Sequence, residues 1–147
     1  MKRLAKIAIV VLVLGLLTAT VVSAETIQGT GTLTARGAGV ARVQGDGTVD
    51  IKGLGVGTVW VHNAETLRAS GRGMRWDLPG GVLFAGWSGR IHASGEELTV
   101  TMSGGLIHFT ARGSGTVFLK GYGSYWLNGE PGNWSPEGIT IDLEAAQ

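Results

Sequence analysis

Three histidines are the side chains of this sequence best suited to bind a metal ion or to transfer protons: His62, His92 and His108. All are even-numbered, and in the strand register described below even-numbered side chains point away from the core. His92 and His108 are sixteen residues apart, which in an antiparallel meander separates them by about 10 Å. That is too far for one zinc ion, and the sequence lacks zinc-ligand spacing and calcium-loop motifs. We therefore predict solvent-exposed histidines, no metal site and no cofactor.

Carboxylates and a serine are the next candidates for catalysis. Glu96 and Glu97 are adjacent and point to opposite faces of a strand, whereas glycoside hydrolysis needs two carboxylates facing one cleft. Ser88 lies in Gly-Trp-Ser-Gly, which is not the Gly-x-Ser-x-Gly elbow, and no helix follows the Gly-x-Gly repeats to receive a phosphate. The sequence predicts no catalytic residue and no enzyme. A hydrolase remains an alternative, with further carboxylates at Asp50, Asp77 and Glu130.

Aromatic side chains offer a third kind of chemistry, the stacking of sugar rings on flat surfaces. Trp60, Phe118 and Trp126 lie at even positions between apolar neighbours, so they are expected on the face opposite the core. Phe118 and Trp126 are eight residues apart and are expected to be cross-strand neighbours. Together with Trp134, in the turn-rich segment 128–138, they are our candidate ligand-binding residues. The alternative is that a second layer covers this face.

The N-terminal segment indicates export. Lys2, Arg3 and Lys6 precede an apolar stretch, 7–22, and Val22-Ser23-Ala24 fits a small-residue cleavage site. We predict a signal peptide over residues 1–24, which would direct the protein to the periplasm, the cell envelope or the medium. The alternative is a retained anchor, although sixteen apolar residues are fewer than the roughly 20 of a spanning helix. In the cleaved form, membrane contact would end with this segment.

Removal of residues 1–24 changes the charge of the chain. The remaining residues carry nine Lys and Arg against eleven Asp and Glu, a formal net charge of −2. A basic surface for nucleic acid is therefore not expected. The sequence has no cysteine, so the fold must be stabilised by burial and backbone pairing.

Glycine recurs every eight residues through most of the chain. Gly29, Gly37, Gly45 and Gly53 follow this interval, and Gly31 to Gly55 repeat it two residues later. The spacing returns from Gly73 to Gly89 and from Gly105 to Gly129, with Glu97 once in the place of glycine. Between glycines, apolar and polar residues alternate, which predicts strands with one buried face. Trp76 and Trp87, among apolar neighbours, are expected in the core.

A two-residue turn and a six-residue strand add up to eight. Asp46-Gly47 has the residue types of a type I′ turn, which needs positive φ at both positions. Gly39, Gly115 and Gly123 lie at equivalent places and are expected to be turns as well. We therefore predict one all-β domain over residues 25–143, an antiparallel meander closed as a sandwich or barrel, followed by a frayed tail, 144–147. The alternative is a parallel β-solenoid with glycines at its corners.

The block Gly113-Ser114-Gly115-Thr116-Val117 and its imperfect copies resemble the repeats of bacterial exported Gly-x-Gly β-proteins, including autotransporter adhesin head domains. The resemblance implies a β-helical fold, no catalytic residues, and a surface or adhesion role. Together these observations predict a non-catalytic secreted or cell-envelope module, structural or adhesive. Its expected partners are a glycan or cell-surface polymer, or further copies of itself. A carbohydrate-binding module is the first alternative.

Overall fold

The computed structural model describes residues 26–144, and every regular element in that range is a β-strand. The strands are β1 (Thr26–Thr30), β2 (Thr32–Leu54), β3 (Thr58–His62), β4 (Thr66–Leu78), β5 (Gly81–Leu127), β6 (Glu130–Asn133) and β7 (Ile139–Glu144). The predicted all-β class is confirmed. No helix that could span a membrane is found in residues 26–144. The predicted signal peptide lies outside the described residues, as do residues 145–147.

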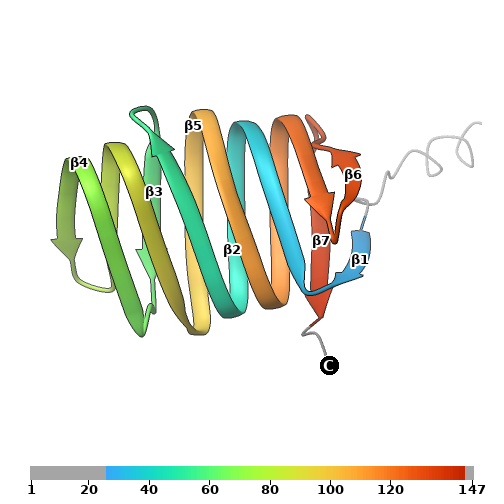
Figure 1. Cartoon of the computed structure of the whole chain (residues 1–147), viewed down its shortest axis with the longest axis horizontal. Helices are drawn as coiled ribbons and strands as arrows, with labels where there is room; N and C mark the ends of the chain where they lie inside the picture. The colour runs from blue at the N-terminus through green and yellow to red at the C-terminus, as the bar shows by residue number, and fades with distance from the viewer. Residues whose placement is uncertain (1–25, 145–147) are drawn as a thin grey trace, which may run out of the picture.

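Two long strands, β2 and β5, are wound around each other in antiparallel pairing (Figure 1). Most residues of β2 lie between two segments of β5. Val49 faces Ala93 on one side and Ala111 on the other, and Leu33 faces Ala111 and Leu127. Because the same β2 residue touches positions of β5 that are 16 to 18 residues apart, one turn of β5 takes that many residues. The result is a flattened coil with two walls.

The two ends of this coil are built differently. At one end β4 turns back into β5 and pairs with its first turn, from Thr66↔Ser94 to Leu78↔Gly81. β3 lies between two turns of β5. At the other end β7 pairs with β5 and β1, and β6 pairs with the last residues of β5. The sheet is mixed and is not closed as a barrel, since β1 and β4 each pair along one side within residues 26–144.

The core lies between the two walls and is apolar throughout. The core is formed by the alternation of apolar and polar residues that the sequence predicts. From β2, the inward-pointing residues include Leu33, Ala35, Val49 and Ile51, and the residues next to them along the strand point outward. No polar or charged side chain is buried among the described residues. Trp87 is partly buried against the core, as expected. Trp76 is 42% exposed, because it lies between Arg75 and Asp77, which are on the core-facing side of β4, and therefore points away from the core.

The glycines mark the two long edges of the coil, where both strands bend together. Gly45 faces Gly115 and Gly47 faces Gly113, with φ between 130° and 153° in all four residues. A Cβ atom on Gly115 would overlap the carbonyl oxygen of Gln44 on the neighbouring strand. Glycine is therefore required here both for its positive φ and for the close approach of the backbones.

These bends correct the predicted topology. Gly39, Asp46 and Gly47 lie inside β2, and Gly115 and Gly123 lie inside β5, so none of them reverses the chain. At positive φ an extended strand turns a corner without leaving its hydrogen-bonded ladder, and the next octad continues on the opposite wall. The meander of short hairpins is thus wrong. The parallel solenoid is right that glycines lie at corners but wrong about strand direction, because β2 and β5 are antiparallel.

Candidate functional site: a basic wall

One wall of the coil carries a concentration of positive charge on its outer surface. We call this surface the basic wall and define it by its cationic side chains: Arg36, Lys52, Arg68, Arg90, Arg112, His92 and His108. Their neighbours along each strand point into the core, which fixes these side chains outward. The pairing register joins them into one surface, because Arg36 faces His108, Lys52 faces Arg90, and Arg68 faces His92.

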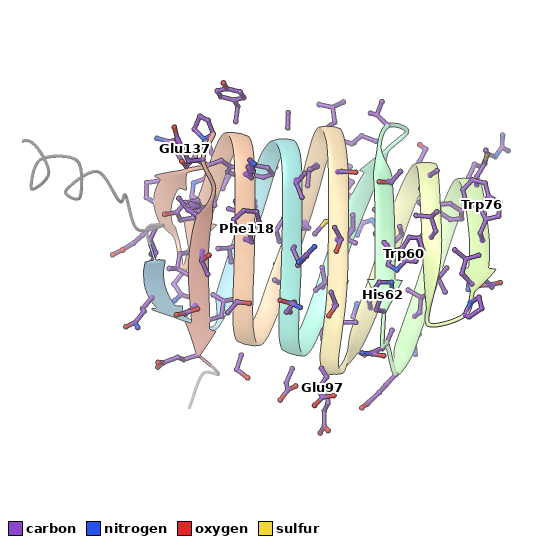
Figure 2. The ribbon with its side chains drawn as sticks, turned by 180° about the vertical axis from the view of Figure 1, so that it is seen from behind. Trp60, His62, Trp76, Glu97, Phe118 and Glu137 are labelled. Atoms are coloured by element: carbon purple, nitrogen blue, oxygen red, sulfur yellow. The ribbon has the colours of Figure 1, made fainter. Side chains whose placement is uncertain are left out.

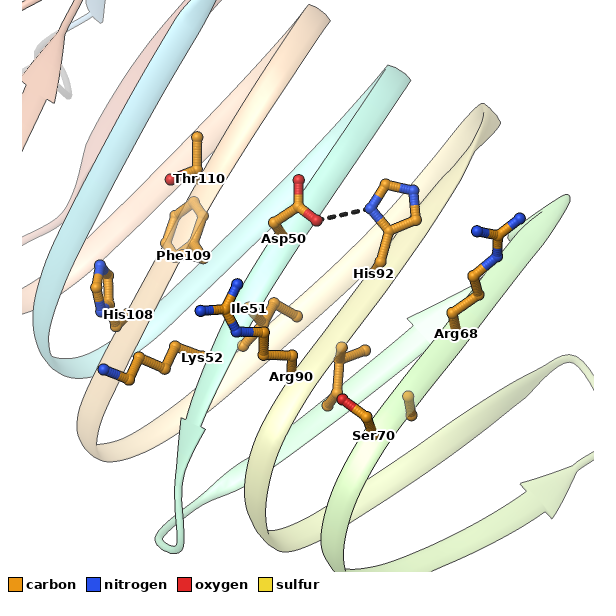
Figure 3. Close-up of a pocket in the computed structure, with 12 residues that line it drawn as sticks. Asp50, Ile51, Lys52, Arg68, Ser70, Arg90, His92, His108, Phe109 and Thr110 are labelled. Atoms are coloured by element: carbon orange, nitrogen blue, oxygen red, sulfur yellow. Dashed lines mark hydrogen bonds and ion pairs between the residues drawn. The ribbon is translucent and has the colours of Figure 1, made fainter.

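A single carboxylate lies among these cations in the described part of the chain. Asp50 faces His92 across the strands, and its Oδ1 is 2.6 Å from Nδ1 of His92 (Figure 3). On its other side His92 faces Arg68. An Asp–His pair is one part of a hydrolytic site, but the residue across the strand from His92 is an arginine rather than a nucleophilic hydroxyl. The five Arg and Lys of the wall against Asp50 leave a local formal charge of +4.

The pKa of His108 reflects the positive charge of this surface. The partial burial of His108, followed by the positive charges of Arg36 and Lys52, lowers the pKa of the imidazole below its ordinary value of 6.5. Nε2 of His108 lies 3.4 Å from Nε of Arg36 and accepts a weak hydrogen bond from it. The same cations that disfavour a proton on His108 favour a bound anion.

The basic wall is hollowed at its centre. A shallow, open hollow of about 410 Å³ lies over Asp50, Lys52, Arg90, His92 and His108 (Figure 3). Guanidinium groups present planar pairs of N–H donors that fit carboxylate, sulfate and phosphate oxygens. Neighbouring strands repeat such donors at intervals of about 4.8 Å across the wall. An open surface of this kind suits a chain of anionic groups lying across it better than an enclosed small molecule.

The four predicted aromatic residues are not brought together. Trp126 is 38% exposed on the same wall as the cations, where it faces Thr34 and, with Arg36, lines a second hollow. Trp134 is buried, and its Nε1 donates to the carbonyl oxygen of Ser124 at 3.1 Å. It is therefore unavailable to a ligand.

Trp60 and Phe118 lie on the opposite wall. Trp60 packs edge-on against His62, with ring centroids 5.0 Å apart, and Phe118 faces Arg42 and Thr140 (Figure 2). The expected pairing of Phe118 with Trp126 is wrong, because eight residues make half a turn of the coil. That interval moves a side chain to the other wall rather than to the next strand.

The carboxylates considered for hydrolysis also lie apart. Glu96 and Glu97 are on a bend, Asp77 pairs with Arg75 at 3.3 Å on β4, and Glu130 is on β6. Within residues 26–144 no three His, Cys, Asp or Glu side chains are placed to hold a metal ion. His62 is on the wall opposite His92 and His108.

The sequence interpretation missed the basic wall because net charge averages over the whole chain. A signal was present: Arg36, Lys52 and Arg68 are sixteen residues apart, as are His92 and His108. Sixteen residues are about one turn of the coil, so this interval returns a side chain to the same wall. In a meander every even-numbered side chain points to the same outer face, so this interval does not single out these cations.

Comparisons with known proteins give no relative. No family model and no curated protein matches the chain. Among solved structures, a non-cellulosomal cohesin from the hyperthermophilic archaeon Archaeoglobus fulgidus aligns over 85% of this chain and 87% of its own, at 10% identity. The TM-score is 0.16, at which the two folds are not alike. The resemblance to exported Gly-x-Gly β-proteins therefore stays a prediction.

Proposed function

We propose that this protein is an exported, non-catalytic adhesive module that binds an acidic polysaccharide of a cell surface or matrix. The observation that carries the proposal is the basic wall. Five of the nine Lys and Arg in residues 26–144 lie on one outer surface with one carboxylate, although the chain without its leader is acidic. Export is inferred from the predicted signal peptide.

Two features favour an acidic sugar polymer as the ligand. The hollow is open and crosses several strands, so a polymer can extend over it and contact cations on β2, β4 and β5 at once. Trp126 lies on the same wall and offers a flat apolar surface beside Arg36, on which a sugar ring can stack while its carboxylate pairs with the guanidinium.

The test is a binding assay with the chain beginning at Glu25 and three probes: polygalacturonate, dextran sulfate and neutral dextran. We expect binding to the two acidic polymers, with affinity that falls steeply as salt is added. The variant Arg68→Gln/Arg90→Gln should lose about tenfold or more in affinity. The matched control, Arg42→Gln/Lys120→Gln, removes two cations from the opposite wall and should bind as the parent does.

Equal losses in the two variants would mean that binding follows overall charge and would contradict a site on the basic wall. Double-stranded DNA is a fourth probe, because it is a polyanion without sugar carboxylates. Tighter binding to DNA than to the acidic polysaccharides would also reject the proposal and would revive a nucleic-acid partner.

A second candidate function, binding of neutral glycans, rests on the exposed ring of Trp126 alone. It predicts retention on neutral polysaccharides that is lost in Trp126→Ala and is insensitive to salt. If Trp126→Ala weakens binding to polygalacturonate but Arg68→Gln/Arg90→Gln does not, the aromatic surface would be the principal site. A hydrolase would instead shorten the polygalacturonate or dextran chains during the assay, which size-exclusion chromatography of the polymer would detect.

A further inference from the structure

The two long edges of the coil differ in composition. One edge is formed by the bends at residues 36–40, 52–57, 71–74, 86–90, 104–106 and 120–123, and we call it the apolar edge. Pairing places these bends side by side, since Gly39 faces Gly121 and Gly104, and Gly89 faces Gly53 and Gly71. The opposite edge, formed by the bends at residues 44–48, 62–66, 94–98 and 112–116, is the acidic edge.

Exposed apolar side chains gather on the first of these edges. Nine large apolar side chains are exposed in the described part of the molecule, and six of them are on the apolar edge: Val40, Leu54, Val56, Met74, Leu106 and Tyr122. Leu106 is 54% exposed and Tyr122 is 73% exposed. None of the nine lies in the four bends of the acidic edge, although Leu78 faces Gly81, which pairs with His62 at that edge. Single exposed apolar residues are ordinary, but a row that follows one edge of the molecule indicates a contact surface.

The charged side chains also differ between the two edges. The six bends of the apolar edge contain five basic residues and no carboxylate: Arg36, Lys52, Arg72, Arg90 and Lys120. Glu137 lies beside them at the end of the coil that carries β7 (Figure 2). The acidic edge contains Asp46, Glu65, Glu96 and Glu97 against Arg112. The molecule thus has an apolar edge flanked by cations and an opposite edge that is acidic.

We propose that the apolar edge docks on the surface of an anionic lipid bilayer. The edge is a row of bends, and the pocket that Val56 and Leu106 line there has a volume of only about 20 Å³, too small for a peptide. The exposed side chains of the row can instead enter a planar interface together. Arg36, Lys52 and Lys120 would then lie at the level of the lipid phosphates, and Tyr122 would lie where aromatic residues favour the membrane–water boundary. The acidic edge would face away from the negatively charged surface.

This surface adjoins the basic wall and shares Arg36, Lys52 and Arg90 with it, but its exposed apolar side chains lie on the bends and do not line the hollow of the wall. It also replaces the expectation that membrane contact ends with residues 1–24. The apolar side chains supply attraction by burial, and the cations supply attraction that depends on anionic lipid and salt. Neither contribution is large alone, so we expect reversible binding.

Vesicle flotation tests the proposal with the chain beginning at Glu25, which contains all core residues described but not the apolar leader. We expect it to float with vesicles of phosphatidylglycerol and phosphatidylcholine, and much less with phosphatidylcholine alone. The variant Val56→Ser/Leu106→Ser/Tyr122→Ser should reduce the bound fraction at least about fivefold. The matched control, Trp76→Ser/Leu78→Ser/Trp126→Ser, removes three exposed apolar side chains elsewhere and should still float.

A label shows which edge meets the lipid. Because the sequence has no cysteine, Leu106→Cys and Ser114→Cys each give a single attachment point for an environment-sensitive fluorophore, on the apolar and the acidic edge respectively. We expect a blue shift on adding vesicles at position 106 and none at position 114. Equal shifts, equal flotation of the two triple variants, or no flotation of the parent chain would each overturn the proposal. Loss of flotation in Arg68→Gln/Arg90→Gln with an unchanged apolar-edge variant would assign lipid binding to the basic wall instead.

Discussion

At the scale of single residues, Glu97 is the exception to the glycine pattern. It occupies a bend at φ 54°, a left-handed conformation that costs a residue with a side chain about 1 kcal/mol. Its backbone N–H donates to Oδ1 of Asp46 at 2.9 Å, and this hydrogen bond does not depend on the side chain. We therefore expect Glu97→Gly to raise the free energy of unfolding by about 1 kcal/mol, measured by urea denaturation.

Two variants separate backbone strain from charge at this bend. Glu97→Gln removes the carboxylate beside Glu96 but keeps a side chain at positive φ. Its free energy of unfolding should therefore rise less than that of Glu97→Gly. Gly115→Ala makes the reverse exchange, from glycine to a residue with a side chain. Gly115 has a φ of 151°, and a Cβ atom there would overlap the carbonyl oxygen of Gln44. It should destabilise the protein by several kcal/mol or prevent folding. If Glu97→Gln is as stable as Glu97→Gly, repulsion between carboxylates rather than strain is the cost at this bend.

The lowered pKa of His108 predicts how the free energy of unfolding depends on pH. The pKa is lowered in the folded state, so the unfolded chain binds the proton more readily. The free energy of unfolding is therefore unaffected by His108 above about pH 6.5 and falls as the pH drops through 6.5 toward the folded pKa. We expect an NMR titration midpoint of the His108 ring below 6.5, and a shallower loss of stability at acid pH in His108→Gln. Bound dextran sulfate should raise the midpoint, because it offsets Arg36 and Lys52. A midpoint at or above 6.5 in the free protein would contradict the electrostatic description of the basic wall.

At the scale of elements, β4 is the strand most exposed to pairing with another molecule. Its outer side lacks a partner within residues 26–144, and positions 71–80 are all exposed. Arg75 and Asp77 lie opposite Phe84 and Val82, so they share the core-facing side of the last strand. The guanidinium of Arg75 lies 5.5 Å from the centre of the Phe84 ring. Charged side chains that point inward at a sheet edge prevent a second strand from adding there.

We therefore expect Arg75→Val/Asp77→Val to associate with concentration, as measured by light scattering, while the parent chain shows no association through β4. The control is Arg42→Val/Asp142→Val. It also replaces one basic and one acidic side chain by valine, but on the wall that carries Phe118 and not on β4. If the parent chain already forms oligomers that Arg75→Glu dissolves, β4 is an interface rather than a protected edge. That result would support the self-association expected from the sequence.

The strands themselves were readable from the sequence, whereas their partners were not. Alternation identified the inward residues of β2 and β7, because each strand is buried on one face whatever its neighbour. The interval of eight located the bends, since most bends bring two backbones too close for a side chain at one position. However, hairpin turns and corners both demand glycine at positive φ. The sequence therefore could not distinguish a reversal from a bend, and Phe118 and Trp126 were assigned to one surface instead of two.

At the scale of the whole molecule, the winding of β2 and β5 decides on which wall or edge each outward side chain lies. Side chains that return after one turn accumulate on one wall, as the cations of the basic wall do, and residues half a turn away belong to the opposite wall. Bends separate in the same way into an apolar and an acidic edge. Because each surface draws on β2 and β5 together, no short segment of the chain contains a complete site.

The same winding predicts how the fold fails when it is shortened. In a solenoid each turn contacts only its neighbours in sequence, and loss of terminal repeats leaves the others folded. Here residues 115–127 flank β2 from Leu33 to Gly45, so a chain that ends at Ser114 leaves that stretch of β2 without one of its two neighbours. We expect this truncation, which removes 33 residues, to abolish the cooperative thermal transition seen by circular dichroism.

Removing as many residues from the free end of the coil should do less harm. Asn63 and Glu97 meet at one bend, where Nδ2 of Asn63 lies 3.4 Å from the carbonyl oxygen of Glu97, so residues 64–96 can be replaced by a short glycine linker. This deletion takes out β4 and the first turn of β5 but leaves β2 between its partners from Leu33 to Gly45. It should keep a cooperative transition at a lower temperature. If the chain ending at Ser114 melts cooperatively and the internal deletion does not, the strands are not interwound as described, and the octads fold as units that succeed one another along the chain.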